Sequence, residues 1–261
     1  MNSTTNWTLA LIAYAISVFA VALFVVRVRE LIGIYKKGQP DPTRSGNRAA
    51  RFKNMLKEVL GHTKMLNFTG TGIAHWFVMV GFGSLGATLL TAYGQVINPE
   101  FALPLIGHFA PFEAFTEFIA WATGIGIVTL IGIRQVTRIA KPGRKSRFSG
   151  SGMGKAYYVE ATILAVVFCI IALRGMEGAL SEHTERNWHF PLTWPIAEIF
   201  KSWSLDQLHT GIQVVATLKI LVSMAWFIVV ASNLTMGVAW HRFLAFFNIY
   251  FKRNASGAHS L

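Results

Sequence analysis

Two histidines in apolar stretches, His75 and His241, lie at matching distances from basic residues. His75 follows Lys64 by eleven residues, and His241 precedes Lys252 by eleven residues. On antiparallel membrane helices that share one side, each imidazole would lie about 16 Å in from its basic residue. A titratable group inside a membrane helix is costly and indicates a functional site. Two imidazoles at one level are what bis-histidine ligation of a heme iron requires.

The alternative is that each histidine only packs and forms hydrogen bonds, and equal depth on two helices favours ligation. A second heme would need another matched pair. His62 and His75 are thirteen residues apart, about 20 Å if helical, and His209 and His241 are thirty-two apart, about 48 Å. Those pairs do not match in level. The remaining histidines are expected in outer loops or in the C-terminal tail, and they are His108, His183, His189 and His259.

The composition is that of a membrane protein. Of the 261 residues, 53% are hydrophobic and only 14% are charged, where a soluble domain has nearer 25% charged residues. The net charge of +12 comes from loops between apolar runs, which argues against nucleic acid as a partner. The single cysteine, Cys169, lies in an apolar run and is expected to be a small buried hydrophobe. Redox chemistry would therefore need histidine-ligated or diffusible cofactors.

The apolar runs predict an all-α membrane protein with a five-transmembrane-helix bundle, forming a single domain over residues 1–261. The last run is too long for one span, so a lead-in over 205–219 is expected before it. The expected spans are 7–26, 66–93, 112–133, 157–180 and 219–241, followed by an interfacial stretch over 242–252.

Basic residues predict the orientation of these spans. Twenty of the twenty-four lysines and arginines fall in the stretches 27–64, 134–155 and 242–253. The positive-inside rule makes that side cytoplasmic, with the N-terminus outside and the C-terminus in the cytoplasm. No basic residue precedes the first apolar run, which favours a retained helix over a cleaved signal peptide. The basic loops could dock an acidic redox partner or anionic lipid, or reflect topology alone.

Several further residues are candidates for a heme pocket. Trp76 and Trp240 flank the two histidines and could line it. Arg134, Arg138 and Arg242 could pair with heme propionates, although basic side chains at this level also snorkel to the interface. The glycines near His75 could admit a macrocycle or simply pack helices, and they are Gly70, Gly72, Gly81, Gly83 and Gly86.

Ionisable residues elsewhere in the spans suggest proton transfer. Glu117 and Arg174 fall in the outer halves of their helices, and Glu160 falls near an inner end. Such groups relay protons to a quinone or form ion pairs, and the sequence does not choose between the two.

Three stretches resemble a known family: 60–66, 74–79 and, most specifically, 235–248. They are similar to the membrane part of the electron-transfer-flavoprotein:menaquinone oxidoreductase type. More distantly, they resemble the cytochrome b (gamma) subunit of respiratory nitrate reductase. The resemblance covers essentially the whole chain. It implies five helices, heme b, electron exchange with menaquinone, and a multi-pass protein in the inner (plasma) membrane of a bacterial cell.

The resemblance also implies which residues hold iron. The inner heme pair of the gamma subunit falls on His75 and His241, whereas the outer pair falls on Leu85 and Ser223. Neither Leu85 nor Ser223 can ligate iron through nitrogen, so one heme b is expected.

The related oxidoreductases continue into a cysteine-rich iron–sulfur domain, whereas this sequence ends in a Ser/Gly/Ala tail. A cytoplasmic iron–sulfur domain or subunit is therefore expected as a partner, with an electron-transfer flavoprotein as donor.

The expected function is the membrane part of a quinone oxidoreductase, a cytochrome b module between a cytoplasmic donor and menaquinone. The quinone cleft is expected near the heme, with His62, Lys64 and Arg242 as contacts, or alternatively at Glu117 and Arg174. The competing hypothesis is a cofactor-free transporter subunit or scaffold whose histidines only pack or relay protons.

Overall fold

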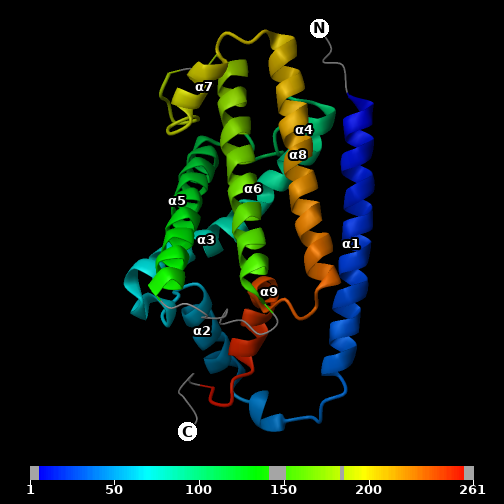
Figure 1. Cartoon of the computed structure of the whole chain (residues 1–261), viewed down its shortest axis with the longest axis vertical. Coiled ribbons are helices and arrows are strands. Elements are labelled where there is room, and N and C mark those ends of the chain that lie inside the picture. Colours follow the sequence, from blue (N-terminus) through cyan, green and yellow to red (C-terminus); the bar gives the residue numbers. More distant parts are fainter. Residues whose placement is uncertain (1–5, 141–150, 183–184, 256–261) are drawn as a thin grey trace.

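The chain forms an all-helical bundle, described by a computed structural model over residues 6–140, 151–182 and 185–255 (Figure 1). His183 and His259 lie outside those residues. The helices are α1 Trp7–Tyr35, α2 Arg48–Val59, α3 Thr69–Ser84, α4 Gly86–Ile97, α5 Ala110–Ala140, α6 Met153–Leu180, α7 Trp194–Phe200, α8 Leu205–Ser232 and α9 Gly237–Tyr250. Short 3-10 turns occupy Pro42–Arg44 and Met65–Asn67.

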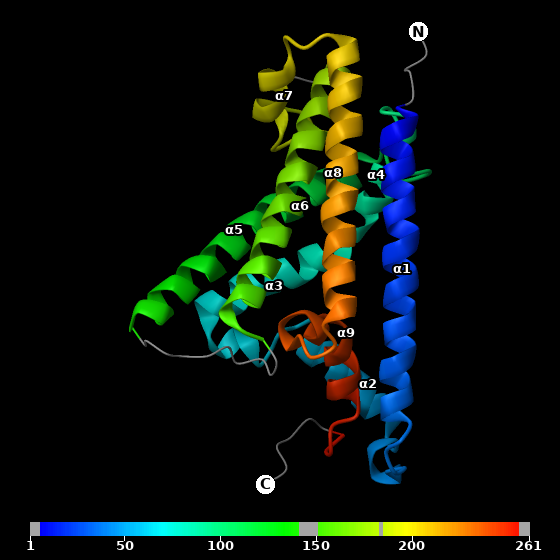
Figure 2. The same cartoon turned by 45° about the vertical axis from the view of Figure 1, so that its right-hand side comes forward.

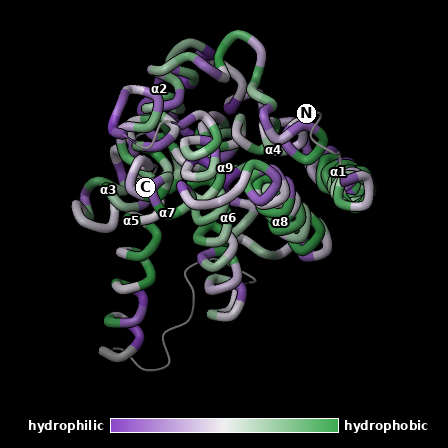
Figure 3. The backbone as a smooth tube through the Cα atoms, turned by 90° about the horizontal axis from the view of Figure 1, so that it is seen from above, coloured by the Kyte–Doolittle hydropathy of each residue, from purple (hydrophilic) through white to green (hydrophobic). Residues whose placement is uncertain are grey.

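Four helices are long and apolar enough to cross a membrane, namely α1, α5, α6 and α8. The pair α3 and α4 makes a fifth span if its two bent halves are counted together. The prediction of an all-α membrane bundle is thus confirmed. The exposed side chains of α1 include Leu11, Val18 and Phe19. Such exposed apolar side chains are what a lipid-facing helix requires. Hydrophobic residues recur along α1 and α8 when the bundle is viewed from above (Figure 3).

The second expected span, 66–93, is not one continuous helix. It consists of α3 and α4, which are bent by 42° about Leu85. Gly83, Ser84 and Gly86 flank the bend. Glycine and serine pairs are common sites of sharp helix kinks. Glycine is conformationally free, and the Ser84 hydroxyl donates to the carbonyl of Val80 at 2.8 Å, a bond that often bends a helix. The hydrophobic run alone gave no sign of the bend.

The prediction that the fifth span covers 219–241 is wrong in its bounds. α8 begins at Leu205 with a capping box formed by Ser204 and Gln207, so the expected lead-in belongs to the same helix. α8 ends at Ser232, where the Asn233 side chain donates to the carbonyl of Val229. That bond competes with continuation of the backbone helix. The chain then turns and α9 starts at Gly237. The helix after the turn therefore begins five residues before the expected interfacial stretch, 242–252.

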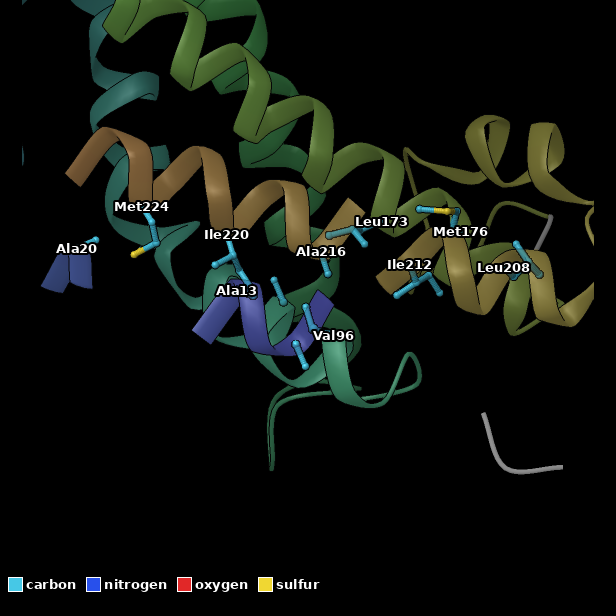
Figure 4. Packing of buried hydrophobic residues seen from close by; sticks show 12 residues of the cluster. Ala13, Ala20, Val96, Leu173, Met176, Leu208, Ile212, Ala216, Ile220 and Met224 are labelled. Carbon is cyan, nitrogen blue, oxygen red and sulfur yellow. The ribbon is translucent and has the colours of Figure 1, made fainter. Parts of the chain in front are cut away.

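The main core lies where α1, α4, α6 and α8 meet. Small residues such as Ala13, Ala92 and Ala216 are fully buried there, which lets the helix backbones approach closely. Larger side chains, including Ile212, Ile220 and Met176, fill the remaining space (Figure 4). This core is on the N-terminal side of the bundle and leaves the opposite end to α2 and α9.

The basic segments meet at that opposite end of the bundle, near the C-terminus (Figures 1 and 2). Arg51 of α2 is only 3% exposed and donates to the carbonyls of Tyr250, the last residue of α9, and of Lys252 beyond it. It also donates to Gly46 and Thr43, so one guanidinium joins the first loop to the C-terminal segment.

Candidate functional site

His75 and His241 come together at the basic end of the bundle. Their ring centroids are 6.1 Å apart, and the ring planes are inclined by 40°. His75 is on α3, but His241 is on the short helix α9 instead of the fifth span. The two residues therefore meet as the sequence suggests, although the helix that carries His241 is not the expected one. Their role as axial ligands stays a prediction.

A third histidine, His62, joins this pair. The sequence predicted His62 near the heme as a quinone contact, but not its contact with His75. Its Nε2 lies 2.8 Å from Nδ1 of His75, and the two ring centroids are 5.0 Å apart. The helical estimate of about 20 Å between these residues fails because α2 ends at Val59 and α3 begins at Thr69. The intervening loop turns back on itself, with His62 at a positive φ of 50°. A positive φ outside glycine cannot be read from hydropathy.

Hydrogen bonds assign a proton to one nitrogen of each ring. A backbone carbonyl only accepts, so His62 Nδ1 donates to Val59 O, 3.0 Å away, and its Nε2 then accepts from His75 Nδ1. His241 Nδ1 donates to Gly237 O at 3.3 Å. In neutral His75 and His241 the proton is thus on Nδ1, and Nε2 is the nitrogen with the lone pair.

The other residues expected at this site have structural partners. Trp76 Nε1 donates to Leu60 O at 2.8 Å, which ties α3 to the loop that holds His62. Trp240 stacks on Phe24 with centroids 5.6 Å apart. The Arg242 guanidinium lies 5.1 Å from the ring of Phe82 and 5.4 Å from that of Trp226. All of these contacts are at the same end of the bundle as the histidines.

Arg134 and Arg138 have no described contact with the histidines. Arg134 donates to Glu160 at 2.7 Å, an ion pair between α5 and α6, and Arg138 is exposed. Lys64, expected as a quinone contact, lies 3.5 Å from the Glu58 carboxylate. Arg134 and Lys64 thus form ion pairs, and for Glu160 this is the alternative to proton transfer that the sequence left open.

Glu58 also binds Lys252, so it joins α2 to the segment after α9. Burial by itself raises the pKa of Glu58, but the hydrogen bonds from Lys252 and Asn54 outweigh burial and hold this pKa below its ordinary value. The carboxylate therefore stays ionised and keeps the two segments together.

A second polar cluster lies at the other end of the bundle, around Arg174 of α6. Its guanidinium is 3.2 Å from Glu113, 3.2 Å from Glu117 and 2.7 Å from Glu177. Glu117 is 1% exposed and also accepts from the backbone N–H groups of Leu192 and Thr193. The two residues predicted from sequence do meet, but as parts of a larger network that includes His189, which binds Glu113 at 2.6 Å.

Lys219 is a buried charge that the sequence interpretation overlooked. It is 2% exposed, and its Nζ donates to the carbonyl and the hydroxyl of Thr88 at 2.7 and 2.8 Å. An ionisable residue inside an apolar run is itself a signal. Treating 205–219 as a lead-in placed Lys219 at a helix end, where a lysine is ordinary.

A cavity of about 490 Å³ opens beside this cluster. Its walls come from α4, the loop before α5, α5, α6 and α8. The polar lining includes Gln95, His108, Glu113, Arg174, Glu177 and Lys219. Glu117 does not line it. The cavity therefore offers both hydrogen-bond donors and carboxylate acceptors to a ligand within the bundle.

Comparison of the chain with protein-family models, curated proteins and solved structures gives no match. Within residues 6–140, 151–182 and 185–255, no group of three or more His, Cys, Asp or Glu side chains is arranged to hold a metal ion. A heme iron needs only two protein ligands, so that finding bears on ordinary metal sites and leaves the histidine pair as the candidate. What the residues define is a multi-pass helical membrane protein with a histidine cluster at one end and a polar cavity at the other.

Proposed function

We propose that the chain is the membrane-anchored cytochrome b module of an electron-transfer complex. It would pass electrons between an iron–sulfur or flavoprotein donor and the menaquinone pool. The observation that carries this proposal is the approach of His75 and His241 to 6.1 Å between ring centroids, with Nδ1 of each ring already hydrogen bonded.

The chemistry of the donor set fits heme b. If one metal ion were bound by both imidazoles, each nitrogen–metal bond would be about 2 Å long. These two bonds, together with the distance from each nitrogen to the centre of its ring, would add up to about the observed centroid separation. Metal-ligating histidines usually donate their second ring N–H to another group, as both rings do here. Bound heme would supply one-electron transfer at a potential set by its axial ligands and their surroundings.

The protein's own residues would orient and shield that group. His75 and His241 would ligate from α3 and α9, with Trp76 and Trp240 as apolar walls. Arg242 would place a cation beside His241, and its two aromatic neighbours, Phe82 and Trp226, would fix its direction. We infer that the iron–sulfur or flavoprotein partner docks at the basic end of the bundle, where Arg48, Lys53 and Lys57 are exposed.

We place the quinone in the cavity at the other end, in preference to the histidine cluster. Lys219 and His108 supply donors to a quinone oxygen, while Glu113 and Glu177 supply sites for the two protons that accompany two electrons. Thirteen residues separate His75 from Thr88, which corresponds to about 20 Å of helix rise. Because the heme and the quinone would each extend into this distance, the edges of their rings would be closer together than about 20 Å. With the quinone in this cavity, Arg174 would hold the carboxylates of Glu113 and Glu177 in place.

Membrane orientation follows from the same proposal. The basic end with α2 and α9 would face the cytoplasm, and the N-terminus with the polar cavity would face outward, in the inner membrane of a bacterial cell. Tagging each terminus and testing its accessibility to a membrane-impermeant reagent would measure this directly.

A difference spectrum tests the cytochrome hypothesis. Purified protein should show a reduced-minus-oxidised b-type spectrum that disappears in His75→Ala and in His241→Ala. His108→Ala is the matched control, because His108 is exposed and lies in the loop before α5. A colourless, folded wild-type protein would contradict the proposal and favour the cofactor-free transporter subunit or scaffold.

A further inference from the structure

His62 is held in a backbone conformation that its sequence neighbours make possible. Its φ of 50° lies in the left-handed region, which few residues other than glycine adopt. At Gly61, an added Cβ would lie 2.6 Å from the carbonyl oxygen of Lys57, so a side chain cannot be accommodated there without movement. Strained backbone of this kind persists where the surrounding structure requires it, and it often marks a functional position.

The result of that conformation is a chain of hydrogen bonds that ends on His75. Val59 O accepts from His62 Nδ1, and His62 Nε2 accepts from His75 Nδ1. The carbonyl fixes the tautomer of His62, and His62 in turn fixes the tautomer of His75. Nε2 of His75 is then the unprotonated nitrogen, which is the form of imidazole that binds a metal.

His62 is also shielded from solvent, with 7% of its surface exposed. The Trp76–Leu60 hydrogen bond connects α3 to the loop on the N-terminal side of His62. Two contacts between α3 and this loop therefore set the distance from His62 to His75. The arrangement constrains the ring of His75 more than packing alone would.

We propose that His62 is a positioning residue for His75, fixing the tautomer and ring direction of this axial ligand and increasing its basicity. The inference rests on the proposed heme site at His75 and His241. An acceptor on Nδ1–H increases electron donation by the ligand, which favours the oxidised iron and lowers the reduction potential. A histidine that only packs in the loop would leave that potential unchanged.

The test uses the full-length protein with its heme, and two substitutions of His62. His62→Leu removes the acceptor, whereas His62→Gln offers an amide oxygen in its place. The heme content should stay at one per chain. Redox titration should give a more positive midpoint potential in His62→Leu than in wild type, with a smaller shift in His62→Gln. The electron paramagnetic resonance signal of the ferric heme should change in the same order. His209→Leu should match wild type in both measurements, because His209 is outside this network, bonds Glu100 at the other end of the bundle and does not line the cavity.

Wild-type potential and wild-type resonance signal in His62→Leu would overturn the inference while leaving the heme proposal intact. If His62→Leu fails to retain heme, the potential of His62→Gln decides the matter, and a value equal to wild type overturns it. If His75→Ala keeps its heme and His62→Leu loses it, then His62 is itself the ligand and the inference is wrong. A wild-type protein without heme would instead overturn the proposed function.

Discussion

Lys219 on α8 donates two hydrogen bonds to Thr88 on α4, one to its carbonyl oxygen at 2.7 Å and one to its hydroxyl oxygen at 2.8 Å. The contact is fully buried and joins the two helices directly. The positions where the resemblance would place an outer heme pair are nearby in the sequence, Leu85 just before α4 and Ser223 one turn after Lys219. Ser223 donates to the Lys219 carbonyl instead.

We therefore predict one heme per chain. The Lys219–Thr88 contact occupies the space between α4 and α8 that a second macrocycle would need, and neither Leu85 nor Ser223 carries a ligating nitrogen. Heme extracted from purified protein and divided by the protein concentration measures this ratio. Two hemes per chain would mean that His108 or His209 ligates iron after a rearrangement of the outer loops.

The Lys219 amine should matter more for quinone turnover than for folding. Lys219→Met keeps the length of the side chain but removes the donor, and replacing a buried charge by an apolar residue of similar size is often neutral for stability. We expect quinone-dependent oxidation of the reduced heme to slow by about tenfold, the equivalent of about one lost hydrogen bond of 1.4 kcal/mol. The heme spectrum should be unchanged.

Lys201→Met is the matched control for this experiment, because Lys201 is exposed and forms only a surface ion pair with Glu198. If turnover in Lys219→Met equals that of the control, the quinone does not bind in the cavity, and the histidine end becomes the favoured quinone site.

Arg174 should be among the most sensitive positions for stability. Arg174→Met would leave Glu113, Glu117 and Glu177 without their shared cation in a buried site. Breaking such a network costs about 3–5 kcal/mol in free energy of unfolding. Thermal or denaturant unfolding in detergent measures the loss, and Arg174→Lys should recover part of it because the charge remains. Arg186→Met, at an exposed arginine, should unfold as wild type does.

The sequence predicted the parts of this molecule that depend on hydropathy and charge. Apolar runs gave the helical bundle, and the pair His75 and His241 was found from depth alone. The break at Asn233 and the bend at Leu85 were missed because hydropathy does not distinguish a continuous span from two helices. His62 was predicted only as a quinone contact, and its hydrogen bond to His75 was missed because that approach depends on a left-handed loop residue. Lys219 was missed because the start of α8 is set by the capping residues Ser204 and Gln207, about four turns before the run was expected to enter the bilayer.

Arg51 should be required to hold α2 against the C-terminal segment. Its guanidinium donates to carbonyl oxygens in the loop before α2 and in the C-terminal segment, and those acceptors would be left without a charged donor in Arg51→Met. Hydrogen bonds that involve a charged group contribute about 1.5–3 kcal/mol each. Water can bond some of the freed carbonyl oxygens at this end of the bundle, which reduces the total loss. We expect a loss of about 3 kcal/mol in free energy of unfolding, or easier proteolysis after α9. Arg48→Met, one turn earlier and exposed, should change little.

The attachment of α2 to the segment after α9 should also weaken in acid, through Glu58. The pKa of this carboxyl is lowered in the folded protein, because the bonds from Lys252 and Asn54 outweigh the opposing effect of burial. A carboxyl whose folded pKa is depressed stabilises the fold fully above its unfolded pKa of about 4.3, and loses that contribution as pH falls through the folded value. Proteolysis of the C-terminal segment, measured between pH 7 and pH 3, should therefore accelerate below about pH 4.3 in wild type. Glu58→Gln should already be cleaved faster at pH 7 and should depend less on pH. A Glu58→Gln protein with the same acid dependence as wild type would assign that dependence to another carboxylate, such as Asp41, which binds Arg44 in the preceding loop.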